Sequence, residues 1–245
     1  MKNNLLLRMK KNIILLFLFI CAISANAQRF AGDITLYPHL GINFAKFSDG
    51  YLYAKYQNQI GGKTKPVFKF GYDIGIELHR QFNERFGASI GLLFAREGGK
   101  LSDYSEETER IKNVIKDSNT SLYYLHLPLL ATADIVKWRN SGISIKVGVQ
   151  PGILVSARNS NETEVYNKKD NIWILDKEKS GRASGNVKSA YKDLNLSIPV
   201  GVEYRYKNYS FDLRYNIGLT KVYEYVDDNI NNRSILLTIG YGIPL

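Results

Sequence analysis

The chain has 245 residues, a formal net charge of +10 and one cysteine, Cys21. A single cysteine excludes an internal disulfide framework. Acidic and basic residues are interspersed along the chain, so we expect no nucleic-acid partner, and no Pro-rich or Ser-rich stretch divides the chain into separate domains.

The first 27 residues (1–27) have the order of a cleavable secretory signal peptide. Positive charges come first, an apolar run over 13–23 follows, and the small-residue triplet Ala-Asn-Ala ends at Ala27. The apolar run is shorter than the roughly 20 residues that a membrane-spanning helix needs. Cys21 would suit a lipoprotein, but the residues before it lack the small side chain that precedes an acylated cysteine. We therefore predict cleavage after Ala27 and a mature domain over 28–245.

Eight segments of the mature chain place an apolar residue at every second position, which is the pattern of strands with two different faces. In chain order the segments cover 34–44, 68–82, 86–94, 123–135, 143–153, 194–206, 209–219 and 235–245. Their second faces are rich in Gly, Ser, Asn and Thr. A tilted strand crosses a bilayer with about 9 to 11 residues, so each segment is long enough to do so.

The chemistry of the two faces decides which one meets lipid. On the apolar face the charges are Lys46, Arg80 and Arg96, and each lies near a strand end, where a long side chain reaches the membrane interface. Aromatic residues gather at both ends of the segments, as in the two girdles of a membrane barrel. A soluble barrel would instead expose many Lys and Glu side chains.

The connections alternate between long and short, and the longest cover 47–66, 98–121 and 157–192. Long extracellular loops and short periplasmic turns alternate in this way in outer-membrane barrels. We therefore predict an all-β fold, an eight-stranded antiparallel up-and-down transmembrane β-barrel in the outer membrane of a Gram-negative-type cell, with both termini periplasmic. One stretch of a loop, 106–116, could form a helical turn or two.

Five prolines fall inside the predicted strands. They are Pro38, Pro128, Pro151, Pro199 and Pro244. A proline cannot donate to a strand ladder, and a closed barrel has no edge on which to place it. We expect bulges or strand ends at these positions.

Three stretches resemble the PorT-like outer-membrane β-barrel family: GINFAKFS at 41–48, LYYLHLPLL at 122–130 and GVEYRYKNYSFDLRYNIGL at 201–219. The resemblance covers nearly the whole mature chain and implies an eight-stranded outer-membrane barrel that tolerates an inner proline such as Pro128. The family takes its name from a member linked to protein secretion, a role that shape alone does not transfer. Leu245 departs from the aromatic residue that ends many such barrels, so recognition by the outer-membrane assembly machinery rests on the whole last strand.

Three histidines, His39, His79 and His126, face the predicted lumen and invite a metal site. They lie at different heights along their strands, whereas the ligands of one metal must each lie about 2 Å from it. We therefore expect neither a metal site nor a cofactor.

A denser group of charges faces the same lumen and forms a candidate network. Its members are Glu77, Lys146, Glu203, Arg205, Asp212 and Arg214. If 207–208 forms a two-residue turn, Glu203 lies opposite Asp212, and the two arginines occupy the diagonals. Paired carboxylates could serve acid-base catalysis, but the neighbouring cations favour a structural network.

We expect the functional residues to lie in the long connections. No Ser, His and Asp grouping can be placed at the outer rim, so we expect no enzyme, and a lumen of eight strands is filled by its own side chains, so we expect no porin-like conduction. The longest connection holds Ile172, Trp173 and Leu175 among charges. An exposed tryptophan is a residue type that anchors partners, although a mobile hydrophilic loop or a hairpin extending the barrel fits the same residues.

We therefore expect a binding, secretion-associated or structural membrane protein. Its partners would be the outer-membrane lipid bilayer, the outer-membrane assembly machinery and an extracellular or secretion-system protein that contacts the loops. A soluble, secreted lipocalin-like carrier of a small ligand is the alternative architecture.

Overall fold

The structure, a computed structural model, describes residues 34–48, 66–224 and 229–245, so the predicted signal peptide lies outside the described residues. The strands are β1 (Ile34–Phe47), β2 (Pro66–Val67), β3 (Lys69–Gln81), β4 (Phe86–Leu101), β5 (Tyr104–Glu107), β6 (Ile111–His126), β7 (Leu129–Lys137), β8 (Ser141–Lys169), β9 (Ile172–Asn186), β10 (Leu194–Tyr206), β11 (Tyr209–Gly218), β12 (Asn232–Tyr241) and β13 (Ile243–Pro244), with a short 3-10 helix η3 (Lys188–Ala190). In this part of the chain no helix is long and apolar enough to span a membrane.

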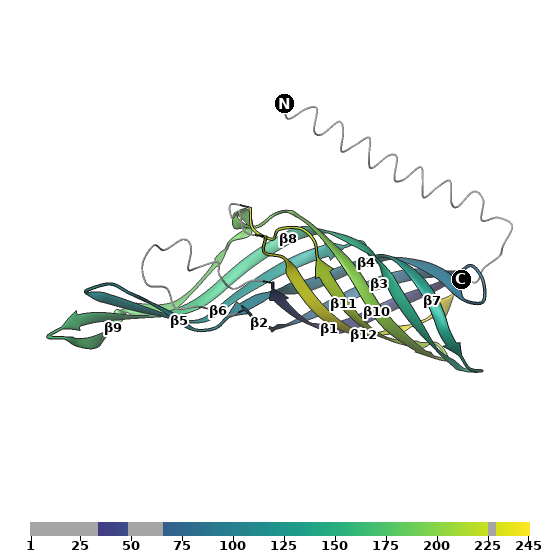
Figure 1. Cartoon of the computed structure of the whole chain (residues 1–245), viewed down its shortest axis with the longest axis horizontal. Helices are drawn as coiled ribbons and strands as arrows, with labels where there is room; N and C mark the ends of the chain where they lie inside the picture. The colour runs from purple at the N-terminus through teal and green to yellow at the C-terminus, as the bar shows by residue number, and fades with distance from the viewer. Residues whose placement is uncertain (1–33, 49–65, 225–228) are drawn as a thin grey trace, which may run out of the picture. The chain divides into compact units, whose positions relative to one another are not determined.

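The strands close into an antiparallel barrel (Figure 1). Going around the wall, β1 pairs with β3, β3 with β4, and β4 with both β6 and β7. Those two pair with β8, which pairs with β10; β11 and β12 follow, and β12 returns to β1. Because β6 and β7 are successive parts of one wall strand, the circuit has eight positions and confirms the predicted eight-stranded barrel.

The two ends of the barrel differ as the connection lengths predict. One end, here called the turn end, carries the short connections 82–85, 138–140 and 207–208. The opposite end, the loop end, carries the connections that follow β1, β4, β8 and β11. The predicted two-residue turn at 207–208 is confirmed, because Tyr206 pairs directly with Tyr209.

Prolines interrupt ladders without shifting the register of the wall. Pro128 lies in the break between β6 and β7, and Pro244 lies in the short β13. Pro38, Pro151 and Pro199 remain inside strands with no register shift at any of them, so the prediction of a bulge or strand end is wrong at these three positions. A missing N–H removes one bond but needs no extra residue, and the pairing of β8 with β10 leaves out the position of Pro199.

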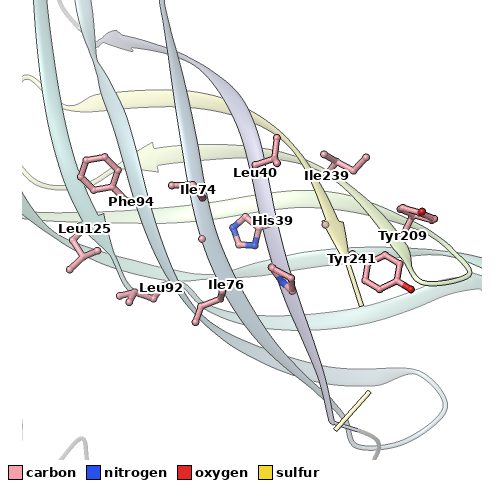
Figure 2. Close-up of a pocket in the computed structure, with 13 residues that line it drawn as sticks. His39, Leu40, Ile74, Ile76, Leu92, Phe94, Leu125, Tyr209, Ile239 and Tyr241 are labelled. Carbon is pink, nitrogen blue, oxygen red and sulfur yellow. The ribbon is translucent and has the colours of Figure 1, made fainter. Parts of the chain in front are cut away.

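Side chains alternate between an apolar exterior and a polar lumen. Leu40 and Ile74 are 61% and 59% exposed on the outside, whereas Asn43 and Lys146 are buried inside. An apolar groove of about 600 Å³ crosses the outer wall over β1, β3 and β12 (Figure 2). This arrangement is the one expected when lipid surrounds the wall.

Beyond the barrel, four strands continue as a sheet in the order β5, β6, β8, β9 (Figure 1). The 29 residues of β8 correspond to about 95 Å at about 3.3 Å per residue, more than twice the roughly 40 Å that a strand tilted by about 40° needs to cross a hydrocarbon core of about 30 Å. The predicted loops 98–121 and 157–192 are therefore largely strand, and the helical turn expected within 106–116 is wrong.

Glycines at the wall allow neighbouring strands to approach closely. A Cβ atom on Gly148 of β8 would lie 1.9 Å from the backbone oxygen of Leu129 on β7. Gly185 of β9 lies outside the barrel, and a Cβ atom there would meet nothing within 4 Å. The two glycines form a matched pair, one inside the closed wall and one outside it.

We predict that Gly148→Ala destabilises the barrel by about 1–3 kcal/mol, because the methyl group must push two wall strands apart. Urea-induced unfolding of the refolded protein in phosphatidylcholine vesicles measures the change. Gly185→Ala, the control, should unfold at the wild-type urea concentration or above it. Equal stability of the two variants would contradict the close packing of β7 against β8.

Candidate functional site

The lumen near the turn end holds a network of charged side chains with Lys146 at its centre. The ammonium group of Lys146 lies 2.9 Å from Glu77 Oε1 and 3.1 Å from Asp212 Oδ2, and it also contacts Glu203. These four side chains are buried. They come from β8, β3, β11 and β10, so the closed wall brings together charges that are far apart in the sequence.

A second cation, Arg214 on β11, completes the pairing of two of these carboxylates. Its Nη2 donates to Asp212 Oδ2 at 2.6 Å and to Glu77 Oε2 at 3.2 Å. Glu203 lies directly opposite Asp212 in the ladder between β10 and β11. Lys146 contacts both carboxylates and so offsets the repulsion between them across the ladder.

Arg205 joins the network on the side nearer the turn end. It lies 3.4 Å from Glu203 Oε1, contacts Asp134, and donates to Ser144 Oγ at 2.8 Å. Asp134 also accepts from Ser144 Oγ at 2.6 Å and pairs with Lys137 at 2.9 Å. All six residues of the candidate network therefore come together, and Asp134 and Ser144 extend it.

Paired in this way, the network fills the lumen and holds the strands in register. Each carboxylate of Glu77, Glu203 and Asp212 contacts at least one cation, which leaves none of them as an unpaired base. Ion pairing of buried charges rigidifies the structure around them. Within the described residues two atoms of the network, Asp212 Oδ1 and Arg214 Nε, are buried without a hydrogen-bond partner. Its chemistry is that of a structural plug.

Above the network, toward the loop end, the described part of the lumen is lined by amides and hydroxyls, by the carboxylates of Asp73 and Glu97, and by the ammonium group of Lys69. Glu97 accepts from Asn232 Nδ2 at 2.5 Å and from Ser234 Oγ at 3.2 Å, and it lies 3.7 Å from His126 Nε2. The other two histidines make separate contacts: His39 with the oxygen of Tyr37, and His79 with Gln81. Among the described residues no group of three or more metal-ligating side chains is gathered.

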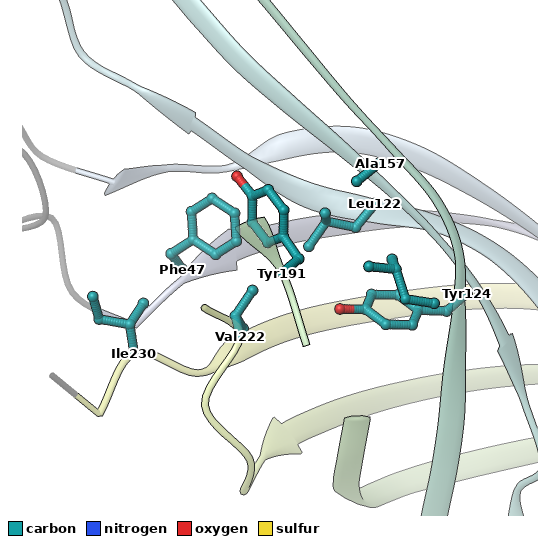
Figure 3. Packing of buried hydrophobic residues seen from close by; sticks show 8 residues of the cluster. Phe47, Leu122, Tyr124, Ala157, Tyr191, Val222 and Ile230 are labelled. Carbon is teal, nitrogen blue, oxygen red and sulfur yellow. The ribbon is translucent and has the colours of Figure 1, made fainter. Parts of the chain in front are cut away.

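At the loop end, an apolar cluster occupies the mouth of the lumen (Figure 3). The mouth cluster consists of Phe47, Leu122, Tyr124, Leu154, Ala157, Tyr191, Val222 and Ile230. Figure 3 shows the ring of Phe47 beside that of Tyr191, with Val222 and Ile230 next to them. This cluster was not predicted from the sequence, although Leu122, Tyr124 and Leu154 break the polar pattern of the lumen and could have indicated it.

The predicted partner-binding residues lie at the tip of a β-hairpin made by β8 and β9 (Figure 1). Its turn residues Asp170 and Asn171 have φ values of 50° and 62°, which suits the type I′ turn of a two-residue hairpin. Ile172 is 66% exposed and Leu175 39% exposed. Trp173 lies beneath the Lys168 ammonium, 5.4 Å from its ring centre. The hairpin alternative considered for this connection is the one observed.

An ion pair on the extended sheet joins β6 to β8. Lys116 Nζ donates to Glu164 Oε1 at 2.7 Å, and the hydroxyl of Tyr166 donates to Glu164 Oε2 at 2.9 Å. The hydrogen bond from Lys116 lowers the pKa of the Glu164 carboxyl below 4.5, and the same bond raises the pKa of Lys116 above 10.5. The attraction is therefore present at neutral pH and is lost below the lowered pKa or above the raised one.

Comparison with known proteins gives one match that covers most of the chain. The model of the family described as outer membrane protein beta-barrel domain matches residues 26–224. A search of curated proteins found no match.

Several solved structures are similar in architecture. Ail, the attachment invasion locus protein of Yersinia pestis, is 14% identical with a TM-score of 0.40, over 87% of this chain and 100% of that one. The outer membrane protease OmpT from Escherichia coli is 11% identical with a TM-score of 0.43, over 87% and 97%. OprG from Pseudomonas aeruginosa is 12% identical with a TM-score of 0.39, over 87% and 96%. All three TM-scores lie below 0.5, so the family assignment rests on the domain match.

We predict that Lys146→Met lowers the free energy of unfolding by about 3–5 kcal/mol, because methionine fills a similar space but leaves three buried carboxylates short of a cation. Urea unfolding in vesicles measures the loss. Lys179→Met is the control, since Lys179 is 65% exposed in its ion pair with Asp176 and such surface pairs contribute about 0–1 kcal/mol. A loss no larger than that of the control would contradict the central place of Lys146.

Proposed function

The chain belongs to the family of outer membrane protein β-barrel domains, and on that premise we propose that it is a non-conducting barrel that binds a partner protein through the hairpin of β8 and β9. In this proposal the loop end faces outward from the cell, and both termini lie in the periplasm after removal of 1–27. The observation that carries the proposal is the filled lumen. Because the lumen has no room for a ligand or an ion path, we place the binding surface on the strands that extend beyond the barrel.

Two obstructions in series support the absence of conduction. The ionic network around Lys146 fills the lumen near the turn end, and the mouth cluster packs across the loop end. A barrel of eight strands has an interior just wide enough for its own side chains. An ion that entered would have to break buried ion pairs and then cross an apolar layer.

The hairpin offers two features that suit a protein partner. At its tip Ile172, Ile174 and Leu175 are exposed, beyond the part of the wall that lies in the membrane. Among the described residues β9 pairs with β8 alone, so its outer edge presents backbone groups to which an extended segment of a partner can add. The resemblance to the PorT-like family favours a component of a secretion system as that partner.

The exterior and the lumen argue against the soluble carrier considered as the alternative. A lipocalin-like carrier needs an apolar interior and a polar exterior. Here Glu77, Lys146 and Asp212 lie inside, and apolar side chains such as Leu40 and Ile74 cover the outside of the wall. We propose no enzymatic activity, since Glu77, Glu203 and Asp212 are held in ion pairs.

We predict that the mature protein in a planar lipid bilayer is electrically silent between pH 6 and pH 8, because the network and the mouth cluster remain intact there. Single-channel recording at fixed voltage checks this. Addition of a porin to the same bilayer afterwards shows that the recording detects open pores. Stable conductance steps of porin size from this protein would sink the proposal of a closed barrel.

We predict that a photo-crosslinking amino acid at Ile174 gives one dominant protein adduct in the native outer membrane, which mass spectrometry identifies. The same amino acid at Asp193, exposed between η3 and β10 at the loop end, is the control. Combining the probe at Ile174 with Ile172→Ser and Leu175→Ser should remove the adduct while the barrel still inserts. Equal labelling from both positions would show that the hairpin tip has no partner of its own.

A further inference from the structure

Two cations face lipid side by side at the loop end of the wall. Lys46 on β1 and Arg233 on β12 are direct partners in the ladder that closes the barrel. Like charges directly opposite each other in a ladder repel. The ammonium group of Lys46 lies over the ring of Phe68, 4.6 Å from its centre. No ion pair joins either cation to a carboxylate among the described residues. A negative charge supplied from outside the chain would turn this repulsion into attraction.

A third lipid-facing cation, Arg96 on β4, lies on the same side of the barrel. Its Nη2 donates to Ser121 Oγ at 3.2 Å, while its Nε is buried and has no partner in the described part of the chain. No ion pair joins Arg96 to a carboxylate among the described residues, so its positive charge is left for an anion from outside the chain. Arginine binds phosphate well because its donors form a planar fork.

The apolar groove of Figure 2 lies on the same strands as these cations. Its upper wall is one continuous row across five strands, made of Ile239, Leu40, Ile74, Phe94 and Leu125. Its floor is a second row in which His39 stands between two glycines, Gly75 and Gly240. Figure 2 shows Phe94, Leu92 and Leu125 on one side and Ile239, Tyr209 and Tyr241 on the other.

The distance between groove and cations matches one leaflet of a bilayer. Leu40 lies six residues from Lys46 along β1, and Ile239 lies six residues from Arg233 along β12. Six residues span about 20 Å, which at a tilt of about 40° is about 15 Å of depth. A hydrocarbon core is about 30 Å thick, so the groove lies near the depth that an acyl chain reaches when its head group is at the level of the cations.

We propose that Lys46, Arg233 and the groove form one binding site for a phosphate-bearing lipid of the outer leaflet. The phosphate lies between Lys46 and Arg233, and an acyl chain runs down the wall into the groove. Arg96 stands one outward position above Phe94 on β4 and binds a second anionic group of a larger head group. The apolar groove selects a lipid over free phosphate, and the paired cations select a phosphate-bearing lipid over an uncharged one.

Native mass spectrometry of the mature protein, refolded in an uncharged detergent, tests the site with three probes. Dioleoyl phosphatidic acid should remain bound as a one-to-one adduct. Dioleoylglycerol, which has the same chains without phosphate, and inorganic phosphate should each bind on the order of tenfold more weakly. Equal retention of dioleoylglycerol would overturn the role of the cations, and binding of inorganic phosphate as tight as that of the lipid would overturn the role of the groove.

Two variants assign the binding to this site. The double variant Lys46→Gln with Arg233→Gln should lower the affinity for phosphatidic acid on the order of tenfold. The control Lys177→Gln with Lys179→Gln removes the same charge from the exposed hairpin and should leave the affinity unchanged. Arg233→Gln alone gives the same test with a smaller loss if the double variant does not fold. A loss of affinity in the control equal to that in the double variant would show that only net charge matters and would overturn the site.

Leu40→Trp tests the contribution of the acyl chain to binding separately from that of the head group, because the larger side chain occupies the groove. The substitution should lower the affinity for dioleoyl phosphatidic acid severalfold and leave the affinity for short-chain dihexanoyl phosphatidic acid unchanged. Equal weakening of both lipids would contradict an acyl chain in the groove.

Discussion

Within lipid, each backbone N–H and C=O group must find its partner inside the protein, and this constraint shapes the whole wall. The chain meets it by pairing β1, near the start of the barrel, with β12, near its end. Closure leaves no strand edge in the membrane. It also explains why the prolines interrupt single ladders where the neighbouring backbone still pairs, as at Pro128, whose oxygen accepts from the N–H of Gly91 at 2.9 Å.

A closed wall of eight strands leaves little room for water in the lumen, so the charges inside must neutralise one another. Lys146 contacts three carboxylates from three other strands. Arg214 donates a hydrogen bond to Glu77, although the two residues are 137 positions apart in the sequence. The network therefore forms only when the wall has closed, and in turn it fixes the register of the strands that carry it.

Alternation predicted the wall strands because their two faces meet different surroundings. It also predicted that Glu203 lies opposite Asp212, since a two-residue turn fixes that register. β5 and the first part of β6, up to residue 117, escaped prediction because most of their side chains on both faces are exposed or half-buried, so apolar and polar residues do not alternate there. The mouth cluster escaped for another reason: Tyr191, Val222 and Ile230 come from connections without periodicity, and long-range closure alone brings them to the lumen.

The length of β8 has a mechanical consequence. One uninterrupted strand runs from the turn end of the barrel to the hairpin tip. Its ladder bonds to β6 and β10 lie perpendicular to the strand, so a pull along its axis loads many bonds at the same time in shear. A load applied at the tip is thereby shared along the wall, and the hairpin is a stiff tether rather than a hinge.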